Sequence, residues 1–158
     1  MELMVKITLI ALFLIVLYQD LKERQVYWFL FPLIGLCCGF LYYSVTLTEL
    51  FISSVLINSA FVSLLLVVVY IYTRLKLKTS FFEGIGLGDI LLFFGLTFTF
   101  SSVSFIVIFI GALVFSLVLH LAFKRSKSTV PLAGYISLFF GLTYLSYWLG
   151  IINSVYSI

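Results

Sequence analysis

The chain has 158 residues, of which 64% are hydrophobic and 9% are charged, and its mean hydropathy is +1.30. Soluble domains carry about 25% charged residues, so this composition excludes a soluble globular protein and indicates a polytopic membrane protein. The length is that of a single domain, residues 1–158. A net charge of +3 without a basic tail gives no indication of nucleic-acid binding.

Six apolar segments are each expected to form a membrane-spanning helix, since a span needs about 20 mostly apolar residues. The segments are 3–19, 27–47, 50–73, 89–101, 102–123 and 131–152. The fourth and fifth form one apolar run that would be about 54 Å long as a single helix, which is too long for one span. We therefore expect a turn near Ser101–Ser104 and a fourth helix that is short or begins before Asp89. The predicted fold is an all-α membrane protein with six transmembrane helices.

The basic residues predict the orientation of these spans. Eight of the nine Lys and Arg residues lie in the turns after spans one, three and five, and only Lys6 lies toward the other side. The eight are Lys22, Arg24, Arg74, Lys76, Lys78, Lys124, Arg125 and Lys127. Because loops rich in Lys and Arg stay in the cytoplasm, both termini are expected to be extracytoplasmic. We interpret the clusters mainly as topology signals that also contact anionic lipids.

The two aspartates of the chain stand at the ends of predicted spans on the same side. Asp20 ends the first span in "VLYQDLKERQVYWF", and Asp89 opens the fourth in "GIGLGDILL". A carboxylate close to hydrocarbon is costly and is functional by default. Two carboxylates brought together by helix packing share a proton, and such a pair can activate water. One deprotonates the water while the other protonates the scissile carbonyl oxygen, with no metal or cofactor.

Three glycines, Gly84, Gly86 and Gly88, precede Asp89. They leave room for a substrate backbone to approach closely, and they disfavour regular helix. The alternative is an ordinary glycine-rich turn in which Asp89 caps the fourth span.

Other polar residues of the spans have structural interpretations. Cys37 and Cys38 are adjacent and no CxxC pair exists, so neither a zinc site nor a disulfide is expected. Asn58 lies inside the third span and is expected to hydrogen-bond across helices.

"GIGLGD" with an upstream aspartate at the end of the first span resembles the GxGD aspartic proteases, specifically the type IV prepilin and archaeal preflagellin peptidases. "STVPLAGYISLFFG", residues 128–141, is similar to the proline–glycine stretch that opens the last helix of that family. The resemblance covers all six spans in order. The chain departs from the family where Tyr27 and Trp28 replace the usual Pro-Asn. It also lacks the insert with paired cysteines that larger members carry, so it resembles the short form without methyltransferase activity.

The resemblance implies a membrane aspartic endopeptidase in the prokaryotic cytoplasmic membrane, with Asp20 and Asp89 as the catalytic pair. Its substrate would be a pilin- or flagellin-like single-span precursor whose short basic leader is cut at the cytoplasmic face. The residues expected in the substrate-binding or active-site loop are Glu83, Gly84, Gly86, Gly88, Pro131 and Gly134. Glu83 would attract the basic leader, although a solvated loop charge is the favoured interpretation of this residue.

Three alternatives remain open. A presenilin-like intramembrane protease would use the same chemistry on a substrate cut within its helix. A small proton-coupled carrier or assembly subunit would also keep two membrane carboxylates. An inactive homologue of the peptidases would keep the fold alone. The sequence gives neither the cleavage-site sequence nor the oligomeric state.

Overall fold

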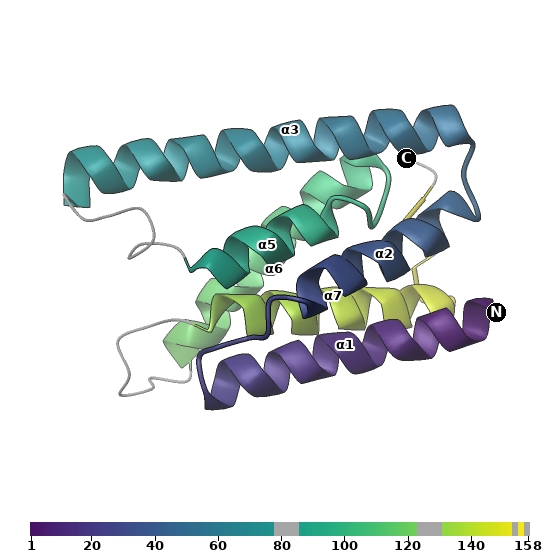
Figure 1. Ribbon diagram of the computed structural model, residues 1–158, viewed down its shortest axis with the longest axis horizontal. Helices are drawn as coiled ribbons and strands as arrows, with labels where there is room; N and C mark the ends of the chain where they lie inside the picture. The colour runs from purple at the N-terminus through teal and green to yellow at the C-terminus, as the bar shows by residue number, and fades with distance from the viewer. Residues whose placement is uncertain (78–85, 123–130, 153–154, 157–158) are drawn as a thin grey trace.

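The computed structural model describes residues 1–77, 86–122, 131–152 and 155–156. Within these residues the chain is all-helical, as predicted, with six α-helices in the expected order (Figure 1). They are α1 (Glu2–Lys22), α2 (Leu30–Tyr43), α3 (Thr48–Tyr72), α5 (Leu87–Leu96), α6 (Ser102–Ala122) and α7 (Leu132–Trp148). A single π-helical turn, η1 (Thr73–Leu77), continues α3.

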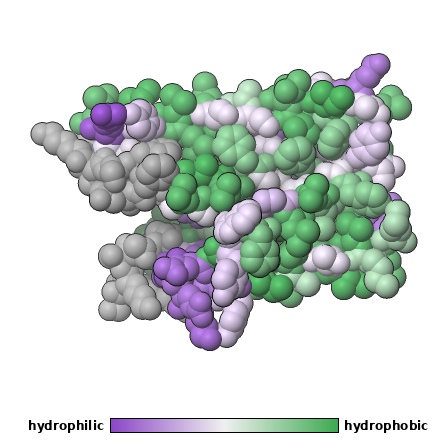
Figure 2. Space-filling model, viewed as in Figure 1, coloured by the Kyte–Doolittle hydropathy of each residue, from purple (hydrophilic) through white to green (hydrophobic). Residues whose placement is uncertain are grey.

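Among the described residues, three stretches of helix are long and apolar enough to cross a membrane: Glu2–Lys22, Thr48–Leu75 and Ser102–Ala122. Large apolar side chains such as Leu36, Leu56 and Val107 are exposed on the helix exteriors. Figure 2 shows an extensive hydrophobic face between ends that carry the most hydrophilic residues. Helices that are apolar on all sides are typical of membrane spans, so the chain has the character of a membrane protein.

One of the predicted spans forms a helix shorter than expected. The segment 27–47 contains only the 14 residues of α2. At the end of α2, the Ser44 hydroxyl donates a hydrogen bond to Leu41 O at 2.9 Å, a local contact that competes with helix continuation. The number of membrane crossings and the side of the termini stay predictions from the sequence.

The bundle is built around α1, α2, α5 and α7, while α6 packs on α7 and α3 contacts α6 (Figure 1). Aromatic rings fill much of its interior, and Phe13, Phe93, Phe109 and Phe140 are essentially inaccessible to solvent. The Phe93 and Phe109 rings meet edge to face with centroids 5.0 Å apart, which ties α5 to α6. Rigid aromatic contacts of this kind fix the short α5 in the centre of the bundle.

Helix α5 approaches α2 closely because both carry glycine at their crossing. A Cβ added at Gly95 would lie 2.8 Å from the backbone oxygen of Phe31, and one added at Gly35 would lie 3.3 Å from Gly95 Cα. Small residues let helix backbones approach in this way inside membranes. The position of α5, and with it the position of Asp89 in its first turn, depends on this contact.

The turn between α5 and α6 spans Thr97–Ser101, slightly before the predicted Ser101–Ser104. The threonines end α5, since the Thr97 and Thr99 hydroxyls donate to Phe94 O and Leu96 O, both at 2.7 Å. As predicted, α5 is short and begins before Asp89.

Asn58 of α3 holds this turn. Its side-chain Nδ2 donates to Thr97 O at 3.0 Å and to Phe100 O at 3.1 Å, and the residue is fully buried. Irregular backbone inside an apolar bundle needs such partners, so the predicted interhelical role of Asn58 is confirmed.

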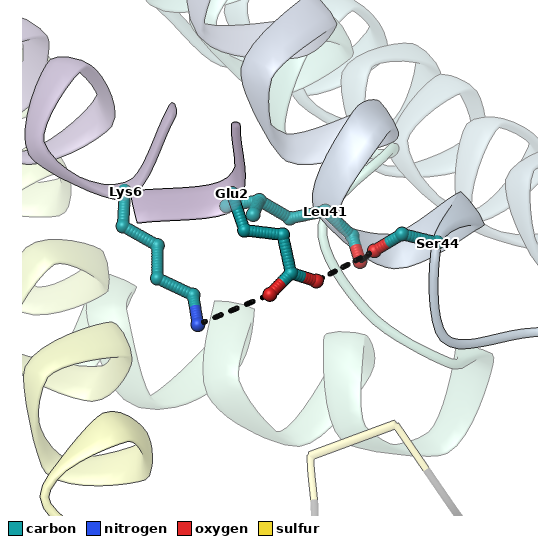
Figure 3. A network of polar contacts seen from close by, with 4 residues as sticks. All are labelled: Glu2, Lys6, Leu41 and Ser44. Atoms are coloured by element: carbon teal, nitrogen blue, oxygen red, sulfur yellow. Dashed lines mark hydrogen bonds and ion pairs between the residues drawn. The ribbon is translucent and has the colours of Figure 1, made fainter. Parts of the chain in front are cut away.

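The end of the bundle that carries the N-terminus is joined by a polar contact between α1 and the end of α2 (Figure 3). Lys6 Nζ lies 3.9 Å from Glu2 Oε2, and the Ser44 hydroxyl lies 3.5 Å from Glu2 Oε1. Exposed ion pairs contribute little to stability, so apolar contacts fix this end of the bundle.

Replacing Gly95 with alanine is expected to destabilise the protein by about 1–3 kcal/mol, because the new methyl group collides with the Phe31 carbonyl. The measurement is thermal unfolding of the purified protein in detergent. Gly39→Ala is the control, since its Cβ would lie 3.6 Å from Phe98 Cβ, an ordinary contact. An unchanged midpoint for Gly95→Ala would contradict the close crossing.

Replacing Asn58 with leucine leaves the carbonyls of Thr97 and Phe100 without their donor and is expected to cost about 1–3 kcal/mol. The same unfolding assay measures this loss. Ser53→Ala on the same helix is the control, because the Ser53 hydroxyl is exposed and bonds only within α3, to Leu50 O. Equal midpoints for both variants would show that Asn58 does not support the turn.

Candidate functional site

Asp20 lies in the last turn of α1 and is buried, with 8% of its surface exposed. Its Oδ2 accepts a short hydrogen bond of 2.6 Å from the backbone N–H of Gly134, at the start of α7. The absence of a side chain at Gly134 makes this contact possible, since a Cβ there would lie 3.2 Å from both Cβ and Oδ2 of Asp20. The segment around Gly134 therefore belongs to the environment of Asp20.

Asp89 lies in the first turn of α5, three residues after the N-cap Gly86. Its carboxylate accepts a hydrogen bond from the backbone N–H of Gly86, as an acidic residue at the third position of a helix commonly does. The backbone N–H of Ala133 in α7 also stabilises the negative charge of the Asp89 carboxylate, and the charge of Asp20 acts against it. The predicted capping role is thus present, although Asp89 occupies the third helical position and not the N-cap.

The N-terminus of α7 is where the two carboxylates meet. Its N-cap is Pro131, which has no N–H and no polar side chain to satisfy the first turn. The N–H of the third helical residue, Gly134, donates to Asp20 instead, and the N–H of the second, Ala133, interacts with the Asp89 carboxylate. A helix N-terminus carries partial positive charge, so α7 stabilises negative charge on both side chains. Three segments distant in sequence therefore form one site.

Gly86 and Gly88 are the two glycines before Asp89 that the structure describes, and both have negative φ angles. Because they carry no side chain, they leave space for neighbouring groups. A Cβ on Gly88 would lie 3.4 Å from the Phe31 ring, and one on Gly86 would lie 3.4 Å from Asp89 Oδ2. Gly88 is already inside α5, so the prediction that the glycines interrupt the helix is wrong at this position. Gly84 and Glu83 lie outside the described residues.

From the sequence, Arg24 is interpreted only as a topology signal, but it lies near the carboxylate pair. Arg24 stands four residues after Asp20 and its charge acts on the Asp20 carboxylate. The only sequence signal for this contact was the spacing of four residues across a helix end. The hydrogen-bond donors of α7 are backbone groups, which sequence patterns do not single out.

An apolar groove on the described surface does not include either aspartate. It has a volume of about 720 Å³ and lies between α2 and α5, where Leu91, Phe94 and Phe98 face Gly35 and Gly39. Leu91 and Phe94 lie two and five residues after Asp89 along α5, which places them on the opposite face of the helix, and Phe98 lies in the turn after α5. The carboxylate site and the groove are therefore separate features.

The arrangement permits acid–base chemistry with two carboxylates and a helix N-terminus. Within the residues described, no group of three or more His, Cys, Asp and Glu side chains is placed to hold a metal ion. Two adjacent carboxylates can share one proton, which gives one base and one acid in the same site.

Comparison of the chain with protein-family models, with curated proteins and with solved structures gives no match.

Gly134→Ala is expected to destabilise the protein by about 1–3 kcal/mol, since the added methyl group pushes against the Asp20 side chain. Gly141→Ala is the matched control: it lies on the same helix and also faces α1, but its Cβ would meet Phe13 at 3.8 Å. Thermal unfolding of both variants in detergent measures the difference. If Gly134→Ala unfolds at the wild-type temperature, Asp20 is not held against α7 as described.

Proposed function

We propose that the chain is a membrane aspartic endopeptidase of the GxGD type, related to the prepilin and preflagellin peptidases. The observation that carries this proposal is the convergence of Asp20 and Asp89, from α1 and α5, on the backbone N–H groups that open α7. Placing two carboxylates within an apolar bundle costs free energy, and proteins keep such groups where they have a function. Capping α7 alone would not require two charged groups, because neutral side chains cap helices equally well.

The chemistry follows from a pair that shares one proton. The ionised aspartate removes a proton from a water molecule, and the resulting hydroxide attacks the carbonyl carbon of the scissile peptide bond. The protonated aspartate donates its proton to the carbonyl oxygen as the tetrahedral intermediate forms. The proton taken from water then passes to the leaving nitrogen, and the other aspartate takes back a proton from a hydroxyl of the intermediate as the C–N bond breaks. The products are a carboxylic acid and an amine, and the pair again holds one proton.

The proposed substrate is a single-span, pilin- or flagellin-like precursor with a short basic leader. Asp20 and Asp89 lie at the end of the bundle where α1 finishes and α5 and α7 begin (Figure 1). Lys22 and Arg24 lie at the same end, and loops rich in such residues remain in the cytoplasm. We therefore place cleavage at the cytoplasmic face of a prokaryotic cytoplasmic membrane, where the leader of such a precursor would emerge.

Asp20→Asn and Asp89→Asn test the proposal in membranes that contain a tagged pilin-like precursor, with cleavage followed as a mobility shift. Each variant is expected to lose at least about 100-fold in rate, the usual contribution of a general acid or base. Asparagine has the same shape and its amide oxygen still accepts the bond from α7, so the fold is retained.

Thermal unfolding of the same variants is the control for folding. If a variant unfolds near the wild-type temperature and still cleaves at the wild-type rate, the replaced aspartate is a helix cap and not a catalytic residue. If the wild-type protein itself cleaves no precursor, the proposed substrate is wrong, and an inactive homologue or a carrier becomes the better explanation.

A further inference from the structure

The loop between α1 and α2 exposes three consecutive aromatic side chains, which we call the aromatic loop. Tyr27, Trp28 and Phe29 are 62%, 70% and 51% exposed, and the Tyr27 and Phe29 rings stack with their centroids 5.7 Å apart. The preceding residue, Val26, packs against the core of the bundle. The chain thus directs one apolar side chain inward here and leaves three rings on the surface.

The position of the aromatic loop distinguishes it from the apolar side chains exposed along the helices. It follows the charged or basic residues Lys22, Glu23 and Arg24, at the point where the chain leaves the apolar α1. Tyrosine and tryptophan are enriched at this level of membrane proteins, because their rings contact acyl chains while the O–H or N–H group bonds to water and headgroups. An aromatic loop at the charged end of an apolar helix therefore fits the boundary between hydrocarbon and water.

Helix α1 carries a lysine beside an aromatic ring near each of its ends. Lys22 Nζ donates to the Tyr18 hydroxyl at 3.0 Å and lies 5.3 Å from the centre of its ring. Lys6 Nζ lies 5.7 Å from the centre of the Trp148 ring, at the end of α7. The two lysines are about 24 Å apart along the helix axis. Since lysine side chains extend outward to water, the two pairs match the edges of a hydrocarbon layer about 30 Å thick.

A hydrogen bond connects the aromatic loop to the carboxylate site. Tyr27 N donates to Gln19 Oε1 at 3.2 Å, and Gln19 directly precedes Asp20 in the last turn of α1. Asp20 in turn accepts the 2.6 Å bond from Gly134 N that joins α1 to α7. The depth of the aromatic loop in a membrane therefore sets the depth of Asp20.

We propose that Tyr27, Trp28 and Phe29 bind the headgroup layer of a phospholipid bilayer and anchor the carboxylate site at that depth. The partner is lipid because the loop continues the apolar exterior of the two helices it joins, where Leu14 of α1 and Leu33 of α2 are exposed. Under the proposed function, on which this consequence alone rests, the cleaved bond lies at headgroup level, where the basic leader of the precursor meets its apolar stem.

Depth-dependent quenching of fluorescence tests the anchor directly, because the chain has only two tryptophans. The Trp148→Phe variant, which keeps Trp28, is reconstituted in nanodiscs, where both membrane faces are accessible. Lipids brominated close to the headgroup are expected to quench Trp28 more strongly than lipids brominated near the chain end or aqueous iodide. Dominant quenching by iodide or by the deeply brominated lipid would overturn the proposal. Protection from iodide only after the precursor is added would also overturn it, since the loop would then bind protein.

A spin label near Asp20 measures the depth of the site without any peptidase activity. The label is attached at Glu23→Cys in a chain that also carries Cys37→Ala and Cys38→Ala. Tyr27→Ser with Trp28→Ser is expected to raise the collision rate of the label with an aqueous nickel chelate and to lower that with oxygen. The control exchanges the two rings, Tyr27→Trp with Trp28→Tyr, and should leave both rates unchanged. Equal rates in the serine variant and the wild type would contradict the anchor.

The serine variant is also checked for folding. Both replaced side chains are exposed, so its unfolding midpoint in detergent is expected to stay near that of the wild type.

Cleavage of the tagged precursor in nanodiscs connects the anchor to the proposed function. The serine variant is expected to lose about tenfold in rate, because the scissile bond and the carboxylates no longer lie at the same depth. Wild-type cleavage by this variant would show that the loop does not position the site. If the wild type cleaves no precursor while Trp28 is quenched as expected, the proposed function fails and the anchor stands. If the wild type cleaves while iodide quenches Trp28, the anchor fails and the proposed function stands.

Discussion

Two carboxylates at one end of an apolar bundle, one buried and one partly buried, need partners, and the backbone of a third helix supplies them. Asp20 accepts a hydrogen bond from Gly134 in the first turn of α7, and the N–H of Ala133 in the same turn stabilises the Asp89 carboxylate, whereas the N-cap of α7 is a proline that satisfies none of those N–H groups. The first turn of α7 has N–H groups without an acceptor of its own, and the two carboxylates need hydrogen-bond donors. The contact therefore satisfies both. These contacts join the end of α1 and the start of α5 to the start of α7.

Close backbone contacts bring the three segments into register. Gly134 allows α7 to meet Asp20, and Gly95 and Gly35 allow α5 to lie against α2. In a bundle whose exterior and interior are both apolar, the hydrophobic effect gives little reason for one arrangement over another. Steric fit at glycines and aromatic rings, together with a few buried polar contacts, has to select the native arrangement instead.

The helical class, the order of the helices and the shortness of α5 could be predicted from the sequence because each depends on local hydropathy and length. The approach of Asp20 to Asp89 was expected only from their placement on one side, and the donors that join them are backbone groups of Ala133 and Gly134 that leave no pattern in the sequence. The sequence predicts the turn after α5 at serines. In the structure, threonine hydroxyls bonded to preceding carbonyls end the helix earlier. Arg24 has a left-handed backbone conformation, with a φ angle of +58°. This conformation depends on the folded loop, and no residue pattern in the sequence predicts it.

The turn held by Asn58 has a consequence for how the protein is made. A helix of ten residues is too short to enter a bilayer as an independent span during synthesis. The carbonyls of Thr97 and Phe100 in the turn after it would also be unsatisfied in lipid before Asn58 of the earlier α3 is present. Helices α5 and α6 should therefore insert together as a hairpin after α3 has settled, so that a residue distant from both aspartates governs the biogenesis of the site.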